Sequence, residues 1–310
     1  MVPVSVSEMG ELNHLKDRFP SLSRQVAGVT LADGSTWGIA AGDEQASAIV
    51  SHLTEAMQLR PHSEPEYRLL VLTDGRNVPP NFTPLAHKFS GPVLWDFLPA
   101  GGDNTITCVV SPARGGDIMA NQLLQLSLVI ARQVQFRGGF LLHGALMEEN
   151  GRGVILAGPG GVGKTTASRR LPLSWRSLSD DETLVVRDKR GKYWAHPWPT
   201  WSNFMSGGQG GIWDVERAVP LKAIFFMEQA QHDGVKCLGV GASACLLVES
   251  AKQASCPMPY SLSDDEVRAI HLQCFDNICV AVKFVPCYHL RLSLQGVFWK
   301  EIERVIQKIS

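Results

Sequence analysis

The first 115 residues alternate between short apolar runs and turn signals. Residues 28–31 and 67–72 are two such runs, and an Asp-Gly pair closely follows each of them, so both are predicted to be strands. Between them, residues 44–59 carry apolar side chains at a helical spacing. This pattern predicts a small α+β domain over residues 1–115, and it contains no motif that carries chemistry.

A stretch rich in Pro and Gly, residues 77–117, follows and is interpreted as a connector. Within it, residues 92–98 and 105–110 are apolar enough to predict edge strands. Regular leucine spacing then predicts a helix over residues 118–136. We expect this helix to open a second domain over residues 116–310.

Two apolar runs, residues 140–147 and 154–157, are separated by Asn150-Gly151. Asn-Gly is the preferred pair for a two-residue type I′ turn, so the sequence predicts a β-hairpin. The predicted register places His143 opposite Gly158. The histidine is then either a neighbour of the following loop or a satisfied core residue, because a slip of one residue turns its side chain to the other face.

Residues 158–165 read GPGGVGKT and match the phosphate-binding pattern G-x-x-x-x-G-K-[ST] in full. A strand-like run precedes the motif and residues 164–171 read as a helix, which is the order that the motif requires. Lys164 is expected to reach the β- and γ-phosphates of ATP, and Thr165 to bind Mg²⁺. The predicted nucleotide-binding residues are Gly158, Pro159, Gly160, Gly161, Val162, Gly163, Lys164, Thr165 and Thr166.

An acidic pair, Asp180 and Asp181, follows the predicted helix and precedes the strand-like residues 183–186. Phosphoryl transfer to a hydroxyl is helped by a carboxylate that accepts the proton and by another that holds the metal. Because neighbouring strand residues face opposite ways, one Asp is expected to act on the substrate and the other to contact the metal or a helix end, with Asp180 as the candidate for the metal. A solvated acidic turn is the alternative interpretation.

Composition excludes several classes of protein. The net charge is −1 and no run of Lys and Arg occurs, which argues against nucleic acid or an anionic membrane as the main partner. The first residues carry charges where a secretory signal needs an apolar core, so a cytoplasmic protein is expected. The seven cysteines lack metal-binding spacing, which favours reduced, mostly buried thiols.

Residues 193–213 hold four of the eight tryptophans together with a group of glycines. Their prolines exclude a regular helix. Such a composition is typical of a mobile flap that covers an acceptor, and equally of a packed aromatic loop.

The ordered set of histidine, loop and aspartates resembles the catalytic domain of the HPr kinase/phosphorylase family over about residues 138–230. The resemblance implies a P-loop kinase domain with a mixed sheet, in which Asp181 is the base toward an acceptor serine, His143 and Lys164 are active-site residues, and Thr165 is a metal ligand. The matching stretches are His143-Gly144-Ala145, residues 153–165, Ser179-Asp180-Asp181, residues 211–215 and residues 223–228.

The chain departs from that family at two points. The family's metal-binding Glu would fall near Ser206, where no acid stands, and the Gly- and Arg-rich stretch tied to phosphorolysis has no counterpart. By its length and its His-Pro-Trp-Pro-Thr-Trp stretch, the chain more closely resembles the SynChlorMet cassette protein ScmC type. An acceptor in a peptide-modification cassette is therefore expected, rather than a sugar-regulatory protein.

Two other classes compete with a kinase. Residues 206–209 read Ser-Gly-Gly-Gln as in ABC-type ATPases, although Met227 stands where that class needs an Asp. A non-catalytic nucleotide-binding peptide carrier is the second alternative.

The prediction is thus an α/β chain, α+β overall, with an N-terminal domain before an HPr kinase-like domain. C-terminal helices over residues 264–272 and 298–309, with a strand over 288–294, are expected to close its core. The expected activity is ATP- and Mg²⁺-dependent phosphorylation of a Ser or Thr hydroxyl on a peptide or small protein. The sequence is compatible with a homo-oligomer and does not identify the acceptor.

Overall fold

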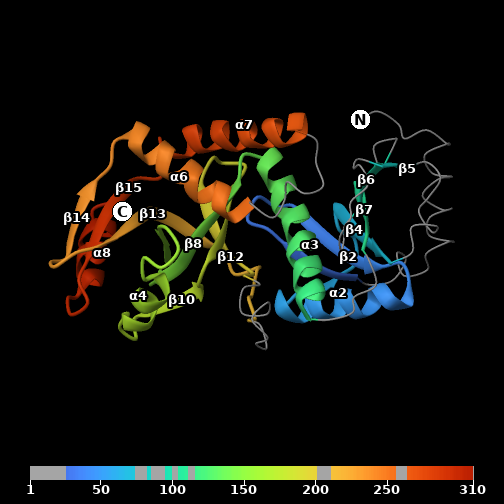
Figure 1. Cartoon of the computed structure of the whole chain (residues 1–310), viewed down its shortest axis with the longest axis horizontal. Helices are drawn as coiled ribbons and strands as arrows, with labels where there is room; N and C mark the ends of the chain where they lie inside the picture. The colour runs from blue at the N-terminus through green and yellow to red at the C-terminus, as the bar shows by residue number, and fades with distance from the viewer. Residues whose placement is uncertain are drawn as a thin grey trace.

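The computed structural model describes residues 26–73, 82–84, 95–99, 104–110, 116–200, 211–255 and 264–309. Within these residues the chain forms two mixed sheets and six helices. Figure 1 shows one sheet on each side of the long helix α3, Gly116–Phe136. The mixed α/β class expected from the sequence is therefore confirmed.

The N-terminal sheet has the strand order β3-β1-β2-β4-β7-β6-β5, and its central strands β2, β4 and β7 run parallel. Helix α2, Glu44–Ala56, packs on it and is capped by the Asp43 carboxylate, which accepts from the Ala46 amide. The strands are β1 Val26–Thr30, β2 Thr36–Ala41, β3 Arg60–His62, β4 Tyr67–Leu72, β5 Phe82–Pro84, β6 Trp95–Pro99 and β7 Thr105–Val109.

The prediction of two edge strands in the connector is wrong. Strand β7 lies between β4 and β6, and β6 lies between β7 and β5. All five residues of β7 are buried, including Thr105 and Thr107, because the strand is paired on both sides. The Pro- and Gly-rich surroundings of residues 105–110 favoured an edge position, although Thr packs well inside sheets.

The second sheet follows the order β10-β8-β11-β12-β13-β15-β14, with β9 pairing with both β8 and β13. The pairings β8–β9, β9–β13, β13–β12, β12–β11 and β11–β8 close a circuit of strands. The strands are β8 Phe140–Glu149, β9 Arg152–Ala157, β10 Trp175–Ser179, β11 Glu182–Arg187, β12 Tyr193–Trp198, β13 Val219–Gln229, β14 Gly234–Cys237 and β15 Cys287–Leu292.

The predicted hairpin is confirmed. Strands β8 and β9 pair from Gly144 opposite Ala157 to Glu149 opposite Arg152, which is the expected register. Asn150 and Gly151 have φ values of 51° and 73°, as a type I′ turn requires.

Four further helices cover the second sheet or close its core: α4 Lys164–Arg170, α6 Val240–Ser255, α7 Asp264–Ala281 and α8 Phe298–Ile306. Helix α6 packs across β8 and against α7 (Figure 1). It was not predicted from the sequence. Helix α7 continues nine residues beyond the predicted end at residue 272.

The tryptophan-rich stretch divides into two parts. Residues 193–198 form strand β12, which is almost wholly buried and pairs with β11, so the flap interpretation is wrong for this part. Pro197 fits the strand opposite Thr183. Residues 201–210, which hold the Ser-Gly-Gly-Gln stretch, lie outside the described residues.

One hydrophobic cluster joins the two sheets, since it includes Val29 of β1, Leu128 of α3 and Trp198 of β12. His196 of β12 adds a polar link. The Ala32 amide donates to its Nε2 at 3.1 Å, and its Nδ1 lies 2.7 Å from the Val215 carbonyl, to which it donates. Burial lowers the pKa of His196 to about 4, against the smaller effects of that carbonyl and of Asp33. The neutral ring therefore connects the N-terminal hairpin to the second sheet.

We expect the free energy of unfolding to fall as the pH is lowered from about 6.5 to about 4. The unfolded imidazole binds a proton over this range, whereas the folded ring does not, and the difference between the two pKa values corresponds to about 3 kcal/mol. Urea unfolding of the wild type and of His196→Gln at pH 7 and pH 4.5 measures it. Equal losses of stability in both proteins would contradict the assignment.

Candidate phosphate-binding site

The loop of residues 158–165 connects β9 to α4 and surrounds the ammonium group of its own lysine. Lys164 is 5% exposed. Its Nζ donates to the Gly158 carbonyl at 3.0 Å and lies 3.0 Å from His143 Nε2. Burial lowers the pKa of Lys164, and the charge of Asp181 opposes this effect. The site therefore holds a cation at the centre of a glycine-rich loop.

Two glycines are required by the local geometry. Gly163 begins α4 with φ 105°, in the left-handed region that side chains disfavour. Gly144 lies where β8 approaches β9, and an added Cβ would come within 2.6 Å of the Ile155 side chain. Gly163 therefore allows the loop to turn into α4, and Gly144 allows β8 to lie close to β9.

His143 lies beside the loop, as the hairpin register predicted. Its backbone carbonyl accepts a hydrogen bond from Ser250 Oγ at 3.1 Å, so helix α6 also holds this part of β8 in place. Burial and then the charge of Lys164 lower the pKa of His143, and Asp181 opposes them. A neutral imidazole whose Nε2 accepts from Lys164 is consistent with these effects.

A β-bulge in β10 lies directly before the acidic residues 180–182. Strands β10 and β11 both run antiparallel to β8, and the pairing of β10 slips between Ser177 and Ser179. Hydroxyl contacts hold the connection: Thr183 Oγ1 donates to the Gly144 carbonyl at 2.8 Å, and Ser179 Oγ accepts from the Leu146 amide at 3.3 Å. Bulges commonly redirect side chains beside functional sites.

Asp181 and Asp180 differ in their surroundings. The charge of Asp181 acts on both His143 and Lys164, so this carboxylate belongs to the same electrostatic group as the loop. Asp180 is exposed and accepts from Ser177 Oγ at 3.3 Å. The structure therefore brings Asp181, His143 and Lys164 together and leaves Asp180 at the rim.

Glu182 is a member of the site that the sequence interpretation missed. Its Oε2 atom is buried and accepts no hydrogen bond from the described residues, although the residue as a whole is only partly covered. Burial and then the charge of Asp181 raise the pKa of Glu182 to about 8. Its place opposite His143 in the β8–β11 pairing could have been found only from the pairing of those strands.

Strand β13 carries an acidic residue, Glu228, close to its end. Strand β13 runs parallel to β9, with Phe226 opposite Ala157. Beyond this pair, Glu228 lies 3.2 Å from His289, and Gln229 Nε2 donates to the Val162 carbonyl at 3.3 Å. The end of β13 therefore borders the loop.

The described residues contain no group of three or more His, Cys, Asp or Glu side chains that could hold a metal ion. Mg²⁺ in phosphoryl-transfer sites needs fewer protein ligands, since one or two carboxylates usually act together with phosphate oxygens and water. Thr165 and Thr166 are exposed on the first turn of α4. The hydroxyl of Thr165 and the carboxylates after β10 thus fit Mg²⁺ only in company with a phosphate ligand.

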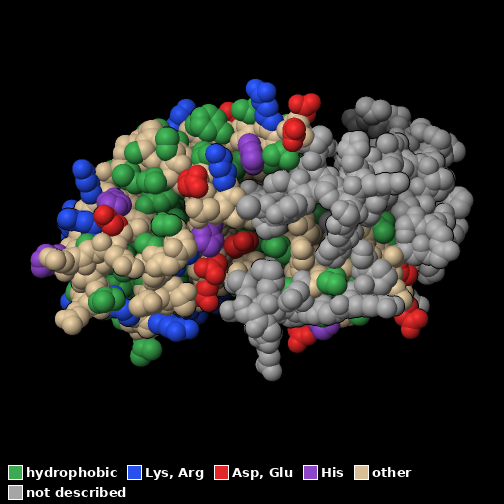
Figure 2. Space-filling model, in the orientation of Figure 1, with side chains coloured by type: hydrophobic (Ala, Val, Ile, Leu, Met, Phe, Trp, Pro, Cys, Tyr) green, Lys and Arg blue, Asp and Glu red, His purple; other side chains and the backbone are tan. Residues whose placement is uncertain are grey.

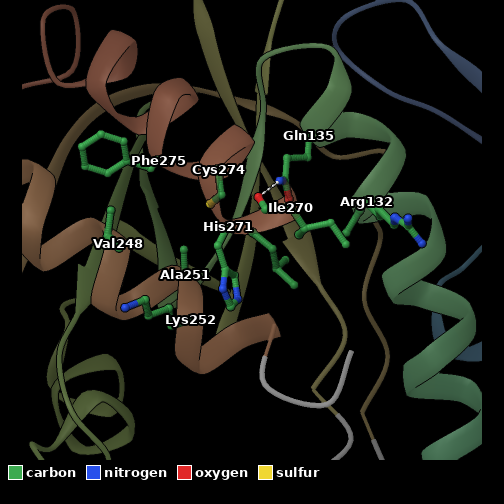
Figure 3. Close-up of a pocket in the computed structure, with 11 residues that line it drawn as sticks. Arg132, Gln135, Val248, Ala251, Lys252, Ile270, His271, Cys274 and Phe275 are labelled. Atoms are coloured by element: carbon green, nitrogen blue, oxygen red, sulfur yellow. Dashed lines mark hydrogen bonds between the residues drawn. The ribbon is translucent and has the colours of Figure 1, made fainter. Parts of the chain in front are cut away.

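A separate cavity lies between α3, α6 and α7 and measures about 480 Å³ including its open mouth. Figure 3 shows Arg132 and Lys252 pointing in different directions, so their charges do not converge. On the face drawn in Figure 2, apolar side chains gather over α6 and α7. The exposed large apolar residues of these two helices include Leu246, Leu272 and Phe275. None of the predicted site residues lines this cavity.

Comparison with known families supplies the remaining observation. The model of the family described as SynChlorMet cassette protein ScmC matches residues 106–307, which is well over half of the 310 residues. The chain belongs to the ScmC family.

The ScmC match begins within β7 and ends after α8, so it includes the phosphate loop, the bulge and β13. No curated protein matches this ScmC chain. Within its described residues, no helix has both the length and the apolar character needed to cross a membrane.

Proposed function

We propose that this ScmC protein is an HPr kinase-like, ATP-dependent kinase that phosphorylates a Ser or Thr hydroxyl of a peptide or small protein. The observation that carries the proposal is the buried Lys164 ammonium, held between the Gly158 carbonyl and the His143 ring inside a complete phosphate-loop motif. Such a cation is suited to the charge that develops on the β- and γ-phosphates during transfer.

The proposed reaction uses Asp181 as the base. The acceptor oxygen bonds to the γ-phosphorus while the bond from that phosphorus to the β,γ-bridging oxygen breaks, and ADP leaves. The hydroxyl proton passes to the Asp181 carboxylate. Burial and the charge of Lys164 lower the pKa of His143, which favours a neutral ring that orients the lysine without adding a second positive charge.

A bound Mg²⁺ would supply positive charge that offsets the negative charge of the phosphates. Of the residues predicted from the sequence, Thr165 and Asp180 would hold it. Thr165 is exposed on the first turn of the loop helix, and Asp180 is exposed directly after β10. The peptide acceptor is supported by the membership of the chain in a family named for a cassette protein.

A non-catalytic nucleotide-binding carrier is the second candidate. It is favoured by the sequence near Ser206, which has no acid where the kinase family has a metal-binding Glu. Single-turnover incubation with γ-labelled ATP, Mg²⁺ and candidate peptides separates the two. A kinase transfers the label to a stable phospho-acceptor, whereas a carrier binds the nucleotide and releases it unchanged.

We expect His143→Ala to lower turnover about 10²-fold, because Lys164 loses the neutral partner that orients it. Melting temperature, measured beside turnover per folded molecule, supplies the control. If the melting temperature falls by many degrees while turnover stays normal, His143 is a core residue without a role in transfer.

A further inference from the structure

We propose that Glu182, rather than Asp180, is the main carboxylate ligand of the divalent cation at the proposed nucleotide site. This inference rests on the proposed function, because the cation arrives with the nucleotide. The proposal also addresses a departure of the sequence from the HPr kinase/phosphorylase family that it resembles. That family has a metal-binding Glu at the position near Ser206, where this chain has no acid.

The strand pairing directs Glu182 toward the phosphate loop. Its Cα lies opposite that of His143 in the antiparallel pair of β11 with β8. Residues directly opposite one another project from the same face of a sheet, with Cβ atoms about 4.5–5.5 Å apart. The His143 ring on that face reaches Lys164 Nζ at 3.0 Å. Glu182 therefore shares a face of the sheet with His143, and its carboxyl is influenced by the charge of Asp181, which also acts on His143 and Lys164.

The Glu182 carboxyl also needs a partner that the described residues do not provide. Its Oε2 is buried and accepts no hydrogen bond, and Glu182 forms no ion pair with any of the described residues. Burying a carboxylate without a partner is costly. A cation shared with phosphate oxygens would satisfy the buried oxygen and use the carboxylate chemistry that Mg²⁺ prefers.

Asp180 fits the same role less well. It follows the last residue of β10, it is exposed, and Ser177 Oγ already donates to its carboxylate. An exposed carboxylate remains hydrated by water, whereas a buried one gains more from binding a cation. The two acids are separated by one residue, so a direct comparison of their variants tests the assignment.

The experiment measures cation binding by the full chain with a non-hydrolysable ATP analogue. Mn²⁺ is titrated in place of Mg²⁺ and followed by electron paramagnetic resonance, and affinity for the analogue without metal is measured by calorimetry. We expect Glu182→Gln to raise the Mn²⁺ concentration for half-saturation at least about 10-fold, with metal-free affinity unchanged. Asp180→Asn should raise it less than about 3-fold.

Glu148→Gln is the matched control. Glu148 is also a poorly exposed strand carboxylate of the same sheet, but it forms an ion pair with Arg217 at 2.6 Å. We expect wild-type Mn²⁺ binding from this variant. If Glu182→Gln does not fold, Glu182→Asp carries the test, because it keeps the charge and withdraws the oxygen by one methylene group; it should weaken Mn²⁺ binding as well.

Each outcome decides the proposal. Unchanged Mn²⁺ binding by Glu182→Gln, with or without a lower melting temperature, would make Glu182 a structural residue and overturn the inference. A larger effect of Asp180→Asn would also overturn it. In both cases the wild type still binds the analogue and the proposed function stands. If the wild type binds no analogue at all, the proposed function and this inference fail together.

Discussion

Lys164→Ala is expected to lower phosphoryl transfer by about 10³-fold or more, which is the largest effect among the predictions. The wild-type ammonium is buried and is held by the Gly158 carbonyl and His143. Alanine removes the charge that would offset the developing charge on the phosphates, and no other described lysine donates to this loop. Transfer of a labelled γ-phosphate under single-turnover conditions measures the loss.

The control for this variant is Lys283→Ala, since Lys283 is an exposed lysine in the turn that follows α7. Both variants should melt near the wild-type temperature. Undiminished transfer by folded Lys164→Ala would mean that residues 158–165 are not the catalytic nucleotide site.

Asp181→Asn is expected to slow transfer about 10²- to 10⁴-fold while ATP still binds. Asparagine keeps the shape and the reach of the side chain but removes the basic carboxylate whose charge acts on His143 and Lys164. Rates are compared at saturating Mg²⁺, with calorimetry to check nucleotide affinity.

Asp180→Asn serves as the neighbouring comparison, and it should change the rate far less at saturating Mg²⁺. If Asp181→Asn transfers phosphate at the wild-type rate while Asp180→Asn transfers none, Asp180 rather than Asp181 is the base. If neither substitution alters the rate, the kinase proposal fails and the carrier becomes the better account.

Local signals in the sequence predicted the secondary structure around the loop well. Asn150-Gly151 specified a turn with two positive φ values, and that turn fixed the register that brings His143 to the phosphate loop. The loop motif itself predicted the strand and helix on its two sides, because its glycines and lysine have defined roles.

Features that depend on distant pairing could not be predicted in the same way. Residues 105–110 were expected at a sheet edge because the stretch around them is rich in Pro and Gly, but β4 and β6 pair with β7 on its two sides. From the sequence, Glu182 was interpreted as the end of an acidic turn. Its place opposite His143 follows from the pairing of β11 with β8, and His143 lies 39 residues earlier in the chain. Helix α6 carries a weak apolar periodicity and is stabilised mainly by packing on β8 and α7.

The central claim is phosphoryl transfer to a peptide hydroxyl, and mass spectrometry tests it most directly. The full chain is incubated with ATP, Mg²⁺ and a peptide encoded beside its gene, and Lys164→Ala is run in parallel. The account predicts a Ser or Thr of the peptide carrying one added phosphate with the wild type and none with the variant. An unmodified peptide in the presence of wild-type protein that demonstrably binds ATP would contradict the kinase proposal.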